Sequence, residues 1–230
     1  IRETAIAIKA KSMGLHVIQE KDLNSSHFKR ELEKLEADLF VVVAFRILPT
    51  SLISIPKLGS INLHGSLLPA YRGAAPIQWA LINGDEETGL STFFITPKVD
   101  TGAVICQDRL SIRPSDNYGT LSERMGILGS DLLVETINLI ESGAASAIKQ
   151  NDNQATLAPK ITKDMTIIDW SRPARKLHNL VRGLTPTPSA TTIIKGKRIK
   201  IQETRVDNDD NGSNYLPGEI TAIKKSIVSV

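Results

Sequence analysis

The stretch NLHGSLLPAYRGAAPIQWA, residues 62–80, closes an apolar strand pattern, turns at a proline and opens a helix. Residues i and i+2 of a strand point to the same side, so Asn62 and His64 are expected to project together from the edge of a sheet. Asp100, in PKVDTGAVI, lies between two further predicted strands, two residues before Gly102. These three side chains form the candidate catalytic group.

An amide, an imidazole and a carboxylate can together promote attack on a carbonyl. An amide N–H of Asn62 and a protonated His64 would stabilise the oxyanion that develops, and Asp100 would hold the imidazole and its charge. An amine substrate can attack the acyl carbon itself, so no serine or cysteine nucleophile is required. A purely structural role for these residues stays open, because Asn often forms turns at strand ends and a single His is often only a hydrogen-bonding side chain.

Strand and helix patterns alternate on both sides of this stretch. The run ADLFVVVAF, residues 37–45, is apolar and β-branched like a strand buried on both faces. The pattern predicts an α/β, Rossmann-like domain with a largely parallel sheet and ligands at the strand ends. The other expected elements are helix 2–13, strand 15–19, helix 25–35, strand 60–63, helix 75–83, strands 89–96 and 103–111, and helix 117–142.

The last third of the sequence has a different character. We expect a catalytic domain over residues 1–142, a polar linker over 143–159 and a second domain over 160–230. After a helix pattern at 172–182, residues 185–206 alternate around a Gly-Lys turn like a β-hairpin, and a further strand pair follows. The pattern predicts a small OB-like β-barrel, although an ordinary interaction domain would show the same strands.

Basic residues gather in this second part. Residues 1–170 carry 17 Lys and Arg against 20 Asp and Glu, whereas residues 171–230 carry 11 against 5. Such a charge would attract a polyanion, or it would form an ordinary solvated face. The candidate phosphate-binding residues are Arg172, Arg175, Lys176, Arg182, Lys195, Lys197, Arg198 and Lys200.

Several other classes of protein are not indicated. Cys106 is the sole cysteine, so no intrachain disulfide can form, and His16, His27 and His178 lack metal-ligand spacing. Neither a P-loop nor a dinucleotide fingerprint is present, and no apolar run is long enough to span a membrane. We expect a cytoplasmic protein that needs no metal.

The motifs together resemble a known family. NLHGSLLPAYRGAAPIQWALINGDEETG followed by KVDTGAVI is similar to the 10-formyltetrahydrofolate-dependent formyltransferases, most strongly over residues 38–111. VVVAFRILP upstream resembles the segment of the family that cradles the pterin, and PKIT with IDW downstream resembles the entry to its C-terminal domain. The closest resemblance is to the branch that acts on methionyl initiator tRNA.

The resemblance implies a reaction and a set of site residues. A formyl group would pass from N10 of 10-formyltetrahydrofolate to the α-amine of methionine on initiator tRNA, in a monomeric enzyme. Asn62, His64 and Asp100 would be catalytic, and the basic cluster would contact the tRNA. The residues implied to bind the folate are Arg46, Ile47, Leu48, Ser66, Leu67, Leu68, Pro69 and Val99.

Other functions share part of this pattern. Formyltransferases that act on glycinamide ribonucleotide or on an amino sugar carry the same three catalytic residues, but the former usually have proline where Gly65 stands. The sugar enzymes tend to carry an arginine where Ala74 or Ala75 stands. A formyl-folate hydrolase would need no basic C-terminal part, and a catalytically inactive tRNA-binding scaffold would need no convergent amide, imidazole and carboxylate.

The resemblance also predicts that the chain is truncated at both ends. It begins at Ile1 within a helix pattern and stops within a strand pattern. The family starts with strands and a basic loop that would precede Ile1, so we expect an incomplete catalytic domain and an incomplete C-terminal domain. On this reading the chain by itself would be unstable or inactive.

Overall fold

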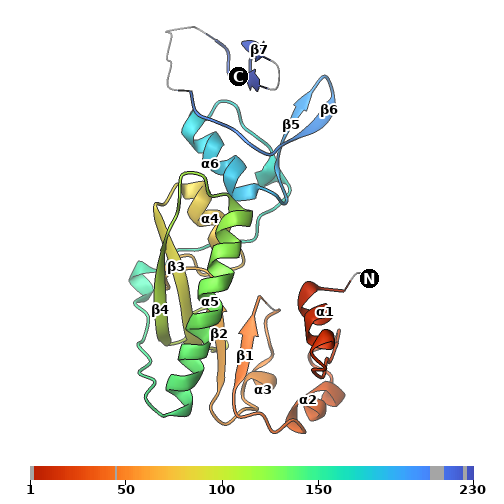
Figure 1. The fold of residues 1–230 in the computed structure, drawn as a ribbon, viewed down its shortest axis with the longest axis vertical. Coiled ribbons are helices and arrows are strands. Elements are labelled where there is room, and N and C mark those ends of the chain that lie inside the picture. The colour runs from red at the N-terminus through yellow and green to blue at the C-terminus, as the bar shows by residue number, and fades with distance from the viewer. Residues whose placement is uncertain (1–2, 45, 208–214, 225–226) are drawn as a thin grey trace.

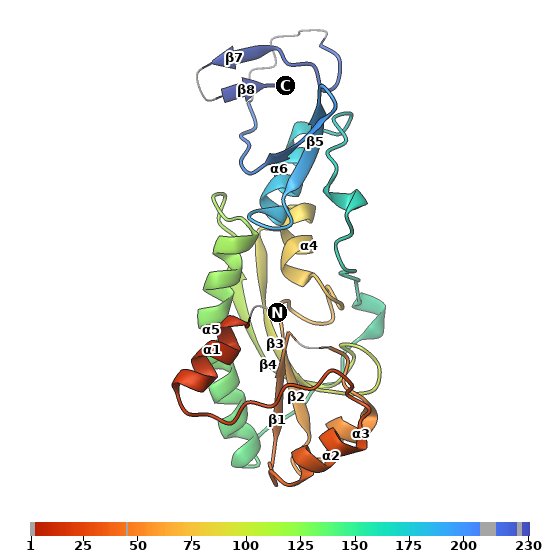
Figure 2. The ribbon, with the colours of Figure 1, turned by 90° about the vertical axis from the view of Figure 1, so that its right-hand side faces the viewer.

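The computed structural model describes residues 3–44, 46–207, 215–224 and 227–230 as two regions stacked along one long axis (Figure 1). The first region holds a four-stranded sheet with helices on both sides. Figure 2 shows α5 (Tyr118–Glu141) on one side of this sheet and α3 (Thr50–Ile53) and α4 (Pro76–Asn83) on the other. Parts of three predicted elements, at residues 2, 45 and 225–226, lie outside the described residues.

The sheet has the strand order β1-β2-β3-β4. The β1 and β2 strands pair in parallel, whereas β2 with β3 and β3 with β4 pair antiparallel. The predicted largely parallel sheet is therefore corrected to a mixed sheet within the described residues. A single loop, 95–103, joins β3 to β4, and so short a connection requires antiparallel strands. The strands are β1 (Phe40–Val43), β2 (Ser60–His64), β3 (Glu87–Phe94) and β4 (Val104–Ser111).

The helices of this region follow the apolar periodicity of the sequence. Asn117 and Thr120 form a capping box at the start of α5, and Gly84 ends α4 in the left-handed conformation at φ 85°. Leu15–Gln19, predicted as a strand, is not one, since it pairs with no described strand. The helices are α1 (Ala5–Ser12), α2 (Ser26–Glu33), α3 (Thr50–Ile53), α4 (Pro76–Asn83) and α5 (Tyr118–Glu141).

The main core lies between the sheet, α4 and α5. It contains Leu81, Leu90, Leu121 and Met125, each less than 5% exposed. Burial of such side chains stabilises a fold by roughly 1.5–3 kcal/mol each. This core fixes the sheet that carries the candidate catalytic residues.

The segment 143–159, predicted as a linker, runs along the first region and is hydrogen-bonded to it. Its residue Ile148 exchanges backbone hydrogen bonds with Val104, and Ala158 is fully buried. It contains the short 3₁₀ helix η1 (Asp152–Gln154). The segment is therefore a structural part of the first region.

The second region contains one helix and two separate hairpins. Helix α6 packs against α4, where a core of Leu177, Val181 and Leu184 also meets Ile82. The hairpins are two-stranded sheets, so the predicted OB-like barrel is not found as a closed sheet within the described residues. The elements are η2 (Asp164–Thr166), α6 (Ala174–Leu184), β5 (Ala190–Ile194), β6 (Lys197–Ile201), β7 (Ala222–Lys224) and β8 (Ile227–Ser229).

Candidate active site

His64 is the last residue of β2, and both of its ring nitrogens face polar groups. Nε2 donates a hydrogen bond to the carbonyl oxygen of Tyr71 at 2.8 Å, because a carbonyl can only accept. Nδ1 lies 3.7 Å from Oδ2 of Asp100, an ion-pair distance. His64 is 6% exposed, and its ring packs against that of Phe93 in a T-shaped arrangement. Nδ1 is therefore the nitrogen that is left to exchange a proton beside the carboxylate.

Asp100 reaches His64 because the loop 95–103 folds back over β2. Its backbone is left-handed, with φ 53°, and its Oδ2 accepts a hydrogen bond of 2.8 Å from the N–H of Gly73. A Cβ at Gly102 would lie 1.6 Å from the carbonyl oxygen of Phe94, so this turn needs a glycine. The DTG motif is thus the local reason that the carboxylate can approach the imidazole.

Asn62 lies two residues before His64 on the same strand and projects to the same side of the sheet. One N–H of its side-chain amide donates to the carbonyl oxygen of Val42 at 2.9 Å. A primary amide has two N–H donors, so the second is left to bind another acceptor. The hydrogen bond to β1 fixes the direction in which that donor can point.

The SLLP turn that follows β2 is held rigidly from the neighbouring strands. The hydroxyl of Ser91 accepts from the N–H of Leu68 at 2.9 Å and donates to the carbonyl oxygen of Ser66 at 2.7 Å. The side-chain amide of Gln107 donates to the carbonyl oxygen of Leu68 at 2.9 Å. Within the turn, the hydroxyl of Ser66 donates to the carbonyl oxygen of Ala70 at 2.5 Å. Of its four predicted folate-contacting residues, Ser66 and Leu68 are buried, whereas Leu67 and Pro69 are half-buried.

The other predicted folate contacts surround the same edge of the sheet. Because β1 and β2 are parallel, the residues after both strands leave the sheet at one edge. Arg46 donates to the carbonyl oxygens of two residues, Glu20 and Lys21, both at 2.7 Å, while Ile47 is 75% exposed. Leu48 is half-buried, and Val99, next to Asp100, is 47% exposed.

The eight candidate phosphate-binding residues lie on α6, on β6 and beside them. Arg172 forms an ion pair with Asp169 at 3.4 Å. Arg182 is half-buried and hydrogen-bonded to Asn179, and burial lowers its pKa. The structure thus leaves six exposed side chains for a polyanion, namely Arg175, Lys176, Lys195, Lys197, Arg198 and Lys200.

Sequence reasoning missed several groups that hold these residues in place. The carbonyl of Tyr71 and the N–H of Gly73 are backbone groups, which leave no signal in a sequence. Gln150 was assigned to the linker, yet its side chain bonds the loop that carries Asp100. The sequence pattern indicates Ser91 only as part of a strand, and nothing in that pattern points to its contact with the SLLP turn.

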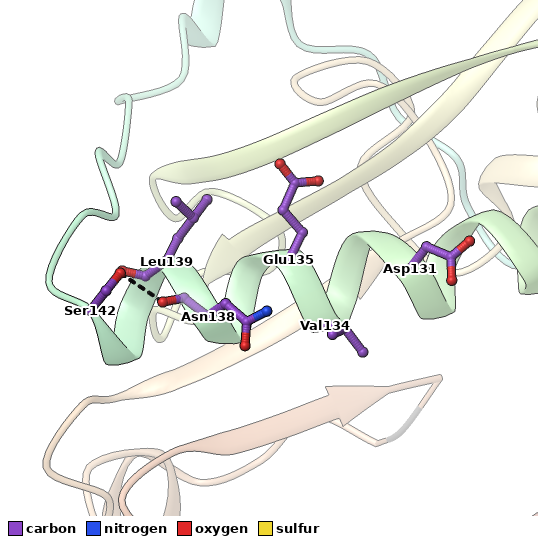
Figure 3. Close-up of a pocket in the computed structure, with 6 residues that line it drawn as sticks. All are labelled: Asp131, Val134, Glu135, Asn138, Leu139 and Ser142. Atoms are coloured by element: carbon purple, nitrogen blue, oxygen red, sulfur yellow. Dashed lines mark hydrogen bonds between the residues drawn. The ribbon is translucent and has the colours of Figure 1, made fainter.

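Two pockets of the structure are lined by residues other than Asn62, His64 and Asp100. One is lined by Asp131, Val134, Glu135, Asn138, Leu139 and Ser142 on α5, as Figure 3 shows. The other lies where α4 meets the second region and includes Trp79, Asp164 and Arg172. Within the described residues no group of three or more His, Cys, Asp or Glu side chains could hold a metal ion, and no helix could cross a membrane.

Comparison with known proteins shows the family. The model of the formyl transferase family matches residues 2–137, and that of the formyl transferase C-terminal domain matches residues 160–230. Methionyl-tRNA formyltransferase of Parabacteroides distasonis is 42% identical over 100% of this chain and 74% of its own length. The enzyme of the same name from Chlorobium chlorochromatii is 43% identical over 94% of this chain and 68% of its own length.

Solved structures agree on the fold. A sugar N-formyltransferase from Shewanella has a TM-score of 0.70 at 20% identity, covering 86% of this chain and 81% of its own. HypX from Aquifex aeolicus, in complex with tetrahydrofolic acid, has a TM-score of 0.68 at 17% identity, covering 88% of this chain and 35% of its own. The matched regions and the identity to the two bacterial relatives confirm the resemblance stated from the sequence, and the chain belongs to the formyl transferase family.

Proposed function

We propose that this protein transfers a formyl group from 10-formyltetrahydrofolate to the α-amine of methionine carried by initiator tRNA. The observation that carries this proposal is the His64–Asp100 pair, 3.7 Å apart at the end of β2, in a chain 42% identical along its whole length to a methionyl-tRNA formyltransferase. The pair supplies the proton chemistry that formyl transfer needs, and the relatives indicate the acceptor.

The residues act at defined steps of the reaction. The methionine amine attacks the formyl carbon, a C–N bond forms, and the carbonyl electron pair moves onto oxygen. The free N–H of Asn62 and a proton on Nδ1 of His64 stabilise that oxyanion. Asp100 stabilises the protonated imidazole, and the proton lost by the amine passes to N10 as the bond from N10 to carbon breaks. Tetrahydrofolate and formyl-methionyl-tRNA are released.

The folate is proposed to lie along the edge where β1 and β2 end. The backbone at Arg46, Ile47 and Leu48 would hold the pterin ring together with Val99. The turn from Ser66 to Pro69 would contact the folate next to the formyl group. The hydrogen bonds that Ser91 and Gln107 make with this turn support the proposal, because they fix the turn in place as one wall of the site.

The second region is proposed to bind the tRNA. Six exposed Lys and Arg side chains on α6, β6 and the β5–β6 turn offer positive charge to phosphates. The hairpins β5–β6 and β7–β8 would belong to an OB-like barrel, a fold that presents β-strands to nucleic acids. Protein synthesis is cytoplasmic, so the proposed substrate places the enzyme there, and we propose that it acts as a monomer.

A formyl-transfer assay with alternative acceptors tests the proposed function. The full-length protein that includes this chain is incubated with 10-formyltetrahydrofolate and with methionyl initiator tRNA, glycinamide ribonucleotide or a nucleotide-linked amino sugar, and the formylated product is measured. We expect formylation of the tRNA alone. Preferential formylation of either small amine would overturn the proposed acceptor, and tRNA binding without formylation of any acceptor would support the inactive scaffold instead.

A further inference from the structure

Gln150 is a buried amide that links three parts of the active-site region. Its side chain comes from the segment 143–159, and the residue is 7% exposed. Nε2 donates to the carbonyl oxygens of Asp100 at 3.0 Å and Gly102 at 2.8 Å. Oε1 accepts two hydrogen bonds from the guanidinium of Arg72, at 2.8 and 3.1 Å. Both ends of the amide are therefore engaged.

The two bonds made by Nε2 fix the backbone on which the carboxylate of Asp100 is mounted. Asp100 has a left-handed φ of 53°, a conformation that costs a non-glycine residue free energy unless its surroundings impose it. Gln150 bonds the carbonyls on both sides of Thr101, so it clamps the bend. Without these donors, the carbonyl of the buried Gly102 and that of the half-buried Asp100 would lose this partner.

The same segment also holds the group that positions the carboxylate oxygen. Arg72 donates its backbone N–H to Thr156 at 2.8 Å, and its carbonyl accepts from the N–H of Ala158 at 2.7 Å. These bonds place the next residue, Gly73, so that its N–H donates to Oδ2 of Asp100. A Cβ at Gly73 would lie 2.6 Å from the carbonyl oxygen of Ala158, which shows how closely the two chains pass.

Arg72 keeps Gln150 in the orientation that this clamp requires. The guanidinium is 7% exposed and donates only, so it selects the oxygen of the amide and turns the nitrogen toward the loop. Arg72 also forms an ion pair with Asp152 at 2.8 Å, and this guanidinium is the main reason that the pKa of Asp152 is lowered. The orientation of Gln150 is thus fixed from both ends.

We propose that Gln150 is a positioning residue for formyl transfer, which holds the backbone of Asp100 so that its carboxylate stays beside Nδ1 of His64. This inference rests on the proposed function, because it concerns the same reaction. It assigns a role in the chemistry to the segment that leads to the second region. Gln150 itself contacts neither the substrates nor the reacting atoms in this role.

Gln150→Glu is the sharpest test, because it keeps the size of the side chain and its acceptor for Arg72. Beside that guanidinium the new carboxylate stays ionised, so it cannot donate to the carbonyls of Asp100 and Gly102. We expect kcat for formyl transfer to fall about 10- to 100-fold, because small displacements of a catalytic group are costly. KM for the tRNA and for 10-formyltetrahydrofolate should change less than about 2-fold.

Two further variants separate loss of the donor from added charge. Gln150→Met removes the donor without charge and should lower kcat over the same range. Gln154→Glu makes the matched charge change at an exposed side chain of the same segment and should leave kcat unchanged. Thermal unfolding of each variant is followed as well, and kcat is compared at a temperature where all of them are folded.

A double-mutant cycle distinguishes positioning from a general structural effect. If Gln150 acts through Asp100, Gln150→Glu should lower kcat little further in a chain that already carries Asp100→Asn. Equal losses in both backgrounds, or a Gln150→Glu enzyme with the kcat of the wild type, would overturn the inference while the proposed function stands. A full-length wild-type protein without formyl transfer would overturn the proposed function itself.

Discussion

At the scale of single residues, Asp100 is the charge on which the imidazole of His64 depends. Asp100→Asn keeps an oxygen that can accept from the N–H of Gly73, but it removes the negative charge 3.7 Å from Nδ1. We expect kcat to fall about 10²- to 10⁴-fold, the range for loss of acid–base catalysis. Single-turnover formyl transfer measures the effect, and the melting temperature should stay near that of the wild type. A rate within about 3-fold of the wild type would contradict the role of the carboxylate.

Tyr71 gives a second prediction at this scale, through pH. Burial raises the pKa of Tyr71 from its ordinary value of 10.0 to about 12, and its hydroxyl donates to Asp85 at 2.6 Å. Because the folded protein binds this proton more tightly, the stability it contributes is complete below pH 10 and is lost as the pH rises toward 12.

The comparison of wild type with Tyr71→Phe isolates this effect from other groups that titrate at high pH. The wild type should exceed the variant in melting temperature by a constant margin below pH 10, and that margin should shrink between pH 10 and about 12. Melting curves across this range supply the measurement. A margin that does not vary with pH would show that the hydroxyl has the same affinity for its proton in both states.

The residues of the site differ in how far the sequence could predict them. Two-residue spacing in a strand placed Asn62 and His64 on one side of the sheet, and the loop between two strand patterns singled out Asp100. The carbonyl of Tyr71 and the N–H of Gly73 depend on the path of a loop, which no pattern of side chains encodes. Gln150 follows His64 by 86 positions in a polar segment, and only the folded chain brings it to the loop.

At the scale of elements, strand β6 and the turn before it concentrate the charge that is proposed to contact tRNA. Replacing Lys195, Lys197, Arg198 and Lys200 together by alanine should raise KM for the tRNA more than it changes kcat, since these side chains lie outside the reacting centre. Affinity of the wild type should fall steeply with salt, and the variant should show a shallower dependence. KM for 10-formyltetrahydrofolate serves as the control. An unchanged KM for tRNA would discredit β6 as a contact.

The elements themselves could be predicted largely from periodicity, but the direction of the strands could not. Helix α4 stands between β2 and β3, and a strand–helix–strand sequence favours a parallel pair, yet this pair is antiparallel. Direction is decided by where the chain re-enters the sheet, and the path through the SLLP turn, α4 and Gly84 returns it at the end where β2 finishes, so that Ser91 pairs with His64. Leu15–Gln19 has a strand-like composition but pairs with no described strand.

At the scale of the whole molecule, the contact between α4 and α6 joins the catalytic region to the region proposed to bind tRNA. The change in composition after residue 142 predicted two regions, but the contact between them could not be predicted. The contact depends on two glycines, which the sequence pattern indicates only as residues that end helices. A Cβ at Gly84 would lie 2.5 Å from Nδ2 of Asn179, and one at Gly183 would lie 2.7 Å from Cγ1 of Ile82.

Gly183→Ala tests whether α4 and α6 must approach this closely, because the gain in helix propensity and the cost of the steric clash differ in size. In a helix interior, alanine is favoured over glycine by about 1 kcal/mol. Against this, the added methyl group would meet Ile82 and the carbonyl oxygen of Gln78 at 3.1 Å, and overpacking of a core costs roughly 1–3 kcal/mol. The clash should outweigh the propensity, so we expect a lower melting temperature and a higher KM for tRNA.

Gly126→Ala, in α5, is the matched control, since nothing lies within 4 Å of its added Cβ, and it should raise the melting temperature. If both variants were stabilised alike, the helices would have room to separate, and α6 could not be the rigid connection between the two regions.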